Sequence, residues 1–310
     1  MNRGDSRIEH ASMTAMPISA HGQRRRMTRI FRRGTGKLVI APVDDSLLAG
    51  PFAGLESVSG KLEQFIGQTE LSNIPAAWDM IPDAVVGYRL ASQHLANRAP
   101  LAPFILNLSA STTMGIHVEK SIVGTVQDAV TCDAAAVAVH VNFTSRFEAR
   151  QLTQLGEVSS AAASAGMPLM GILYPRRERD GVDDNYDALR NEDPAAWTRL
   201  VSHVVRIGAE MGCSIIKTQF TGSARSFETV VQAGEGAAIV IAGGRPRGPE
   251  DFVQTICDAL DAGAAGVSFG RNFFSRTDSR VWIEAANRLV HRADNPVEVL
   301  RWLSSKSTGK

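Results

Sequence analysis

The segment SIIKTQF, residues 214–220, places a lysine, Lys217, inside a short apolar run with β-strand character. The chain carries most of its positive charge on arginine and has lysine only at positions 37, 61, 120, 217, 306 and 310. A lysine kept in an apolar strand suggests that its amine is needed as an amine. A desolvated amine is more readily neutral, and a neutral amine attacks carbonyl groups, which a guanidinium does not do. The alternative is a strand-end lysine that reaches solvent or pairs with a carboxylate.

The lysine segment is one of eight short, β-branched apolar runs, and stretches with helical spacing lie between most of them. Strands that alternate with helices indicate parallel βαβ units, and eight of them over this length predict a single (β/α)8 TIM barrel. An open doubly wound sheet would need a glycine-rich turn directly after a strand, whereas Gly34-Thr35-Gly36 precedes one. The candidate strands are residues 38–43, 84–87, 104–108, 135–140, 169–174, 214–218, 238–242 and 266–269. The candidate helices include residues 118–130, 147–165, 194–211, 226–232 and 249–262.

The composition is that of an ordinary globular protein: 310 residues, 44% hydrophobic and 21% charged, with a net charge of +1. This balance gives no electrostatic reason to expect a nucleic-acid or membrane partner, and no apolar run reaches the length of a membrane span. The three cysteines are scattered without metal-ligand spacing, so we expect no metal and a reducing, cytoplasmic location. Residues 1–26 are expected to form a mobile extension, residues 27–303 the barrel and residues 304–310 a tail.

Chemically useful side chains follow several of the candidate strands, at the carboxyl end of each. Catalytic groups of a TIM barrel come from these ends, which lie at one rim. A purely structural role gives no reason for so many polar groups at this one position. In strand order, the residues are Asp44-Asp45, Ser109-Ala110-Ser111-Thr112, His140-Val141-Asn142, Tyr174-Pro175-Arg176, Lys217, Gly243-Gly244-Arg245 and Gly270-Arg271-Asn272.

The last two strand ends favour a phosphate site. Glycines at Gly243, Gly244 and Gly270 let backbone N–H groups approach an anion closely, and a following helix start adds its dipole. Arg271 adds a charged fork, and the loops after strands seven and eight are a frequent phosphate site in barrels. The alternative is a tight turn at the glycines and a surface ion pair at Arg271.

Imine chemistry at Lys217 needs a second group that moves protons as the carbinolamine dehydrates and the carbon–carbon bond breaks. The expected adjacency of strands five and six places Tyr174 beside Lys217; the alternative is a core tyrosine with its hydroxyl bonded at the rim. Asp44 and Asp45 point to opposite sides if the strand continues through both, so one is expected to face the barrel interior, unless it only caps the turn. His140 is either a second acid/base or a core histidine, and the core interpretation is favoured.

Several motifs occur in order and at barrel spacing: IAPVDD (40–45), LSAST (108–112), IVGTV (122–126), HVN (140–142), YPR (174–176), IKT (216–218), IAGG (241–244), GAAGV (263–267) and GRN (270–272). Through them, residues 27–303 resemble the class I, DeoC/LacD-like aldolase family. That family includes archaeal-type fructose-bisphosphate aldolase, the autoinducer-2 phosphate thiolase and 2-amino-3,7-dideoxy-D-threo-hept-6-ulosonate synthase. The resemblance implies a TIM barrel, a Schiff-base lysine at Lys217, a proton-shuttling tyrosine at Tyr174 and an aspartate at Asp44. It also implies phosphate held at Gly243-Gly244 and Gly270-Arg271.

The chain departs from the family pattern near the expected substrate. The family usually has Asp-His-Gly after the first strand, whereas this chain has Asp44-Asp45-Ser46. Gln219-Phe220 replaces a pair that usually ends in tyrosine, and Arg177 replaces a glycine. The segment 178–191 is longer and more charged than usual. The substrate contact at Asp45 is therefore expected to differ from that of relatives, while the imine chemistry is retained. Ser109 and His140 are also expected to bind the substrate.

These observations predict an aldolase or transaldolase that needs no cofactor or metal. It would join an enamine derived from a ketose phosphate or from dihydroxyacetone phosphate (DHAP) to an aldehyde; the resemblance points to aspartate semialdehyde and a biosynthetic role. One alternative is a fructose-bisphosphate aldolase or a thiolase for a phosphorylated diketone; another is a silent barrel that only binds a sugar phosphate. Relatives form rings, so the resemblance also implies a homo-oligomer.

Overall fold

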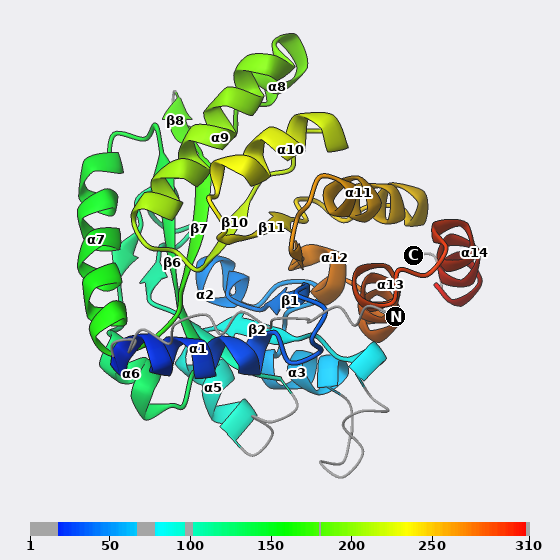
Figure 1. The fold of residues 1–310 in the computed structure, drawn as a ribbon, viewed down its shortest axis with the longest axis horizontal. Coiled ribbons are helices and arrows are strands. Elements are labelled where there is room, and N and C mark those ends of the chain that lie inside the picture. The colour runs from blue at the N-terminus through cyan, green and yellow to red at the C-terminus, as the bar shows by residue number, and fades with distance from the viewer. Residues whose placement is uncertain (1–17, 67–77, 97–101, 180, 308–310) are drawn as a thin grey trace, which may run out of the picture.

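A closed barrel of eight parallel strands forms the centre of the protein, which confirms the predicted TIM barrel (Figure 1). The computed structural model describes residues 18–66, 78–96, 102–179 and 181–307. Hydrogen bonding joins the strands in the order β1-β12-β11-β10-β7-β6-β3-β2 and then back to β1. The strands are β1 (Leu38–Pro42), β2 (Ala84–Gly87), β3 (Phe104–Asn107), β6 (Ala136–Phe143), β7 (Leu169–Pro175), β10 (Ile215–Thr218), β11 (Ala238–Ala242) and β12 (Gly266–Ser268).

The apolar strand sequences are explained by burial on both faces. In β1, Leu38 and Ile40 belong to a cluster inside the barrel, whereas Val39 and Ala41 pack in the cluster shared with the surrounding helices. Successive residues of a strand point to opposite faces, so a strand buried on both faces reads as a continuous apolar run. Lys217 stands two residues after Ile215, which belongs to the inner cluster, so both side chains lie on the inner side of β10.

The helices surround the strands, as Figure 1 shows for α7, α9, α10, α11 and α13. The helices are α1 (Ile18–Ile30), α2 (Asp45–Ala49), α3 (Val58–Ile66), α5 (Arg89–Leu95), α6 (Val126–Thr131), α7 (Glu148–Ser164), α8 (Asp187–Glu192), α9 (Pro194–Glu210), α10 (Ala224–Ala233), α11 (Pro249–Asp261), α12 (Arg271–Phe274), α13 (Ser279–His291) and α14 (Pro296–Lys306), with a 3-10 turn η2 (Trp78–Met80).

The predicted helix 118–130 is wrong in its first half. Residues Ser121–Ile122 form strand β5, which pairs antiparallel with β4 (Ser109–Ala110). Helix α6 begins only after Thr125, whose hydroxyl accepts the backbone N–H of Asp128 while the Asp128 carboxylate accepts the N–H of Thr125. This reciprocal cap fixes the helix start, so the apolar residues before it are available to the hairpin.

The chain ends also differ from the prediction. Residues 18–26, which were expected to belong to a mobile extension, form most of α1, which lies against the barrel beside α7. At its end the helix buries Ile30 and packs Met27 against the inner cluster. Elsewhere polar bonds attach it: Gln23 Nε2 donates to Ser214 Oγ at 2.7 Å and Arg26 donates to the Gly166 carbonyl at 3.1 Å. At the other end, α14 continues to Lys306, beyond the predicted tail boundary. Residues 1–17 and 308–310 lie outside the described residues.

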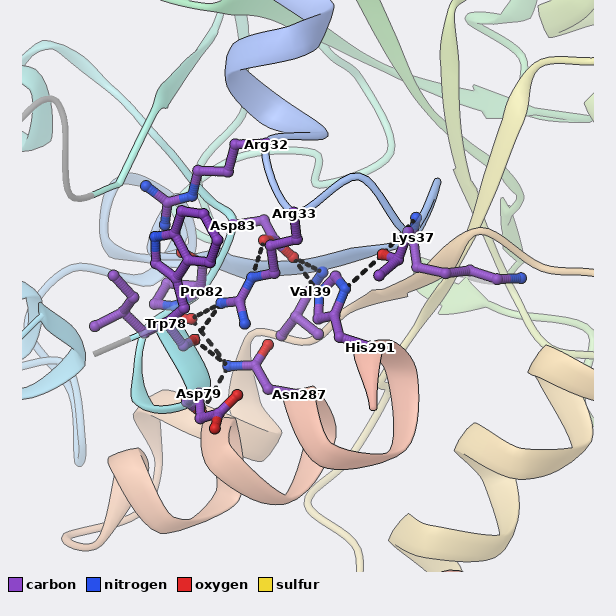
Figure 2. Close-up of polar contacts among 12 residues, drawn as sticks. Arg32, Arg33, Lys37, Val39, Trp78, Asp79, Pro82, Asp83, Asn287 and His291 are labelled. Carbon is purple, nitrogen blue, oxygen red and sulfur yellow. Dashed lines mark hydrogen bonds and ion pairs between the residues drawn. The ribbon is translucent and has the colours of Figure 1, made fainter. Parts of the chain in front are cut away.

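A buried polar network closes the amino-terminal end of the barrel, opposite the carboxyl ends of the strands (Figure 2). Asp83, which directly precedes β2, accepts Arg33 Nε at 2.6 Å, bonds His291 Nε2 at 2.8 Å and accepts the Val39 N–H at 2.7 Å. The side chains of Arg33, Asp83 and His291 are at most 5% exposed. Asn287 of α13 adds bonds to the carbonyls of Asp79 and Ile81. The network thus joins β1, the segment before β2 and α13.

We predict that Asp83→Asn destabilises the fold by about 3–5 kcal/mol at pH 7, because it leaves the Arg33 guanidinium buried without its counter-charge. Burial alone would raise the pKa of Asp83, but the bond from His291 and the charge of Arg33 outweigh it and hold that pKa below its usual value. The stabilisation is therefore present above about pH 4, the pKa of an unfolded aspartate, and is lost as the pH falls through the lower folded pKa. Denaturant unfolding of both proteins from pH 7 downward measures this difference.

The matched control is Asp133→Asn, since Asp133 pairs with Arg29 but is 76% exposed. An exposed ion pair contributes about 0–1 kcal/mol. Equal losses for the two variants at pH 7 would contradict the role given to Asp83.

Candidate active site

A single cavity of about 880 Å³ opens where the strands reach their carboxyl ends. Its wall is formed by residues from every barrel strand or from the loop that follows it. Every residue that the sequence analysis placed in the site lines this cavity: Asp44, Asp45, Ser109, His140, Tyr174, Lys217, Gly243, Gly244, Gly270 and Arg271. The closed barrel brings these side chains together although they are spread over most of the chain.

Lys217 and Tyr174 lie on neighbouring strands. In the register of β7 and β10, Lys217 pairs with Ile172, and Tyr174 stands two residues further along on the same face. No ion pair holds the Lys217 amine among the described residues, although its charge acts on both Asp44 and Tyr174. Burial raises the pKa of the Tyr174 phenol, so the phenol is protonated at neutral pH. The arrangement sets an amine that has no counter-ion beside a proton donor.

Asp44 is held by a short chain of hydrogen bonds. Asn107 Nδ2 donates to Asp44 Oδ2 at 2.8 Å, and Asn107 Oδ1 accepts both the N–H and the hydroxyl of Ser109 at 3.0 Å. The Ser109 hydroxyl oxygen in turn accepts the backbone N–H of His140 at 2.7 Å. Burial raises the pKa of Asp44, while the charge of Lys217 and the Asn107 bond oppose the rise. Asp44 is thus a fixed carboxyl that can gain or lose a proton near Lys217.

His140 packs edge-on against the ring of Tyr174, with ring centroids 5.1 Å apart and an interplanar angle of 89°. Its Nε2 bonds Asn142 Oδ1 at 3.1 Å. Burial, together with the positive charges of Lys120 and Arg176, lowers the pKa of His140 well below its usual value. The imidazole is therefore neutral, and its contact with the ring orients Tyr174.

The turns after β11 and β12 are joined by Asn272, the second residue of α12. Its Nδ2 donates to the Gly243 carbonyl at 3.1 Å, and its Oδ1 accepts the Arg247 N–H at 2.9 Å. A side chain at Gly243 would approach Asn272 Nδ2 to 2.7 Å, so the glycine is required for this contact. The hydroxyl of Ser268, which is buried and lines the cavity, has no hydrogen-bond partner among the described residues. The two glycine turns, this hydroxyl and Arg271 together suit an anion.

A second basic region lies on the other side of Lys217. Lys120 is 4% exposed, and its amine donates to Ser111 Oγ at 2.6 Å. Burial, with the neighbouring charge of Arg176, lowers the pKa of Lys120 to about 8. The Arg176 guanidinium lies 5.4 Å from the centre of the Tyr174 ring, and its Nε donates to Asn185 Oδ1 at 2.7 Å.

Sequence reasoning did not identify Asn107 and Lys120, and it named Arg176 and Asn272 only as parts of strand ends. The available signals were weak. Asn107 is a polar residue inside an apolar strand, and Lys120 is one of few lysines.

Within the described ranges, no group of three His, Cys, Asp or Glu side chains is placed to hold a metal ion. No helix in those ranges is long and apolar enough to cross a membrane.

Comparisons with known proteins agree on one family. Residues 39–276 match the model of the DeoC/LacD family aldolases. A 2-amino-3,7-dideoxy-D-threo-hept-6-ulosonate synthase of Halobacterium salinarum is 32% identical over 280 residues, which cover 90% of this chain and 95% of the relative. A 2-amino-4,5-dihydroxy-6-oxo-7-(phosphonooxy)heptanoate synthase of Streptomyces griseus is 28% identical over 273 residues, or 86% and 90% of the two chains.

The fold also matches solved structures. One is an archaeal fructose-1,6-bisphosphate aldolase whose catalytic lysine is covalently bound to the carbinolamine intermediate of its substrate. The TM-score is 0.70 at 25% sequence identity, and the match covers 86% of this chain and 99% of that one.

We predict that Asn107→Ala raises the pKa of Asp44 further, because the amide bond that stabilises the ionised carboxylate is removed. The measurement is a titration of the Asp44 carboxyl by NMR in protein labelled with 13C at aspartate. Asn185→Ala is the control, since Asn185 is another amide of the cavity but bonds Arg176 instead. An unchanged Asp44 titration in Asn107→Ala would show that the bond has no part in setting this pKa.

Proposed function

Because the chain belongs to the DeoC/LacD family of aldolases, we propose that it joins a DHAP- or ketose-phosphate-derived enamine to an aldehyde, with Lys217 as the imine-forming residue. The observation that carries the proposal is the position of Lys217. Its amine lines the cavity without a counter-ion among the described residues, with Tyr174 on the neighbouring strand and Asp44 within electrostatic reach. A silent phosphate-binding barrel would need neither the amine nor the phenol.

In the proposed reaction, the neutral amine of Lys217 attacks the ketone carbon of the donor and forms a carbinolamine. Tyr174, protonated at neutral pH, donates a proton to the departing hydroxyl, and water leaves as the iminium forms. The iminium withdraws electrons, so Asp44 can remove a proton from the adjacent carbon and leave an enamine. The enamine attacks the carbonyl carbon of the aldehyde, whose oxygen takes up the proton that Asp44 removed. Water then adds to the new iminium and returns a proton to Tyr174, and hydrolysis releases the product and the free amine.

The chemistry of one relative's named product supports the choice of substrates. A 2-amino-4,5-dihydroxy-6-oxo-7-(phosphonooxy)heptanoate has its ketone at the sixth carbon and a hydroxyl on the fourth, which is the β carbon. Aldol cleavage between its fourth and fifth carbons gives aspartate semialdehyde and DHAP. We therefore propose DHAP or a related ketose phosphate as the donor, aspartate semialdehyde as the acceptor, and a biosynthetic role.

A second candidate reaction is the cleavage of fructose 1,6-bisphosphate, which the solved structure of the archaeal aldolase favours. Both reactions pass through the same DHAP enamine and differ in the acceptor. The replacement of the family's usual histidine by Asp45 changes the cavity near the acceptor, which favours a different aldehyde. The homo-oligomeric assembly and cytoplasmic location expected from the sequence remain predictions.

We predict that borohydride added with DHAP attaches the reduced donor to the peptide that contains Lys217. Lys217→Arg should abolish the labelling, because a guanidinium stays protonated and forms no imine. Peptide mass spectrometry identifies the labelled lysine. Lys120, which is also in the cavity and has a pKa lowered to about 8, is the internal control. Label on Lys120 in the unmodified protein, or no label with any ketose phosphate, would contradict the proposal.

For the phosphate site, we predict that Arg271→Ala weakens the use of DHAP about 10–100-fold, the loss expected for a bond between charged groups. Dihydroxyacetone, which lacks the phosphate, should be affected less than about threefold. Donor saturation curves for both compounds provide the comparison. Equal losses for the two donors would place Arg271 outside the phosphate site.

A further inference from the structure

Lys120 and Arg176 are buried cations in the cavity wall, and the carboxylates of Asp45 and Asp183 act on both only by electrostatic attraction, without an ion pair. Among the described residues, neither forms an ion pair; Lys120 donates to one hydroxyl and Arg176 to one amide oxygen. Burial lowers the pKa of both side chains, which records the cost of holding these charges away from water. A buried cation is normally retained in a protein only where an anion meets it. Because no carboxylate is in direct contact with either cation among the described residues, an anionic ligand of the cavity can pair with both.

We propose that Lys120 and Arg176 form a second anion subsite, which binds the carboxylate of the acceptor aldehyde. This proposal rests on the proposed function, because the acceptor is defined by that reaction. A guanidinium beside an ammonium suits a planar carboxylate, which accepts hydrogen bonds on both oxygens. The subsite would select acidic aldehydes over neutral ones.

The order of strands around the barrel places the subsite at the required end of the substrate. The phosphate turns follow β11 and β12, Lys217 is on β10, Arg176 follows β7, and Lys120 precedes β5, whose partner β4 follows β3. Lys217 thus stands between the two basic regions. A condensation product with a phosphate at one end, an imine-forming ketone near it and a carboxylate at the other end matches this order.

Two hairpins at the mouth of the barrel build the subsite. Lys120 and its partner Ser111 belong to the β4–β5 hairpin, and Asn185, which bonds Arg176, directly follows the hairpin of β8 (Arg177–Arg179) and β9 (Val182–Asp184). A contact between His117 Nδ1 and Asp183 Oδ2 ties the two hairpins together. The subsite is therefore positioned by both loops, and the longer, more charged segment 178–191 holds Arg176 through Asn185.

The first test compares acceptors. With DHAP as donor, kcat/KM is measured for succinate semialdehyde, for glyceraldehyde 3-phosphate and for neutral propanal. The ratio of succinate semialdehyde to propanal should fall about 10–100-fold in Lys120→Gln and in Arg176→Gln. It should not change in Arg177→Gln, whose arginine is the sequence neighbour of Arg176 but pairs with Asp184 and is 42% exposed. An unchanged ratio in Lys120→Gln and Arg176→Gln overturns the proposal. If kcat/KM falls only for glyceraldehyde 3-phosphate, the subsite binds a phosphate and the proposal of a carboxylate ligand is overturned.

The second test needs no catalysis. Succinate, which has the carboxylate but no aldehyde, is titrated into the protein by calorimetry. Its affinity should fall about tenfold or more in Lys120→Gln and stay near that of the unmodified protein in Arg271→Ala. The reverse pattern, or no binding to the unmodified protein, overturns the subsite. Borohydride trapping with DHAP is run in parallel; if it fails while succinate binding depends on Lys120, the proposed function is wrong and the subsite stands.

Discussion

The closed parallel register of the barrel is the constraint on which the site depends. Each inner-facing residue is fixed by the pairing of its strand with two neighbours: Lys217 is paired with Ile172 on β7 and with Val240 on β11. Because all eight strands run in one direction, their carboxyl ends meet at one rim and the residues that follow them share one cavity. A shift of one residue in β10 would turn Lys217 outward into the apolar contacts with the helices. The pairing of the strands therefore decides which side chains face the cavity.

The two ends of the barrel hold buried charge in different ways. At the amino-terminal end, Asp83 is surrounded by Arg33, His291 and a backbone N–H, so that its charge is matched. At the carboxyl end, Lys217 has no counter-ion among the described residues. A group that is fully matched contributes to stability, whereas one that is unmatched is available to a substrate. This separation lets the site carry groups that are costly to bury without loss of the fold.

The sequence was sufficient for the barrel, because burial on both faces makes each strand a continuous apolar run and the helices between strands have their own period. It was also sufficient to place the predicted site residues around one cavity, since they lie near or directly after strand ends and these ends share a rim; their roles remain predictions. It did not place Asn107 in the site, because its partner Asp44 is 63 positions away. It did not place Lys120 there either, because that segment was interpreted as part of helix 118–130. These roles depend on tertiary contacts that leave no local pattern. The hydrogen bonds from Gln23 and Arg26 that attach α1 could not be predicted for the same reason.

Arg33 shows what the fold does with a buried cation that has a structural purpose. Its Nε donates to Asp83, and its Nη2 donates to the carbonyls of Trp78 and Ile81. Lys120 is as deeply buried, at 4% exposure, yet its amine meets a single serine hydroxyl among the described residues. An ammonium at this depth without a carboxylate in contact costs free energy, and a lysine kept only to pack its aliphatic stem could be replaced by methionine or leucine at no such cost. The charge itself must therefore be used, and the cavity that it lines is where an anion can reach it.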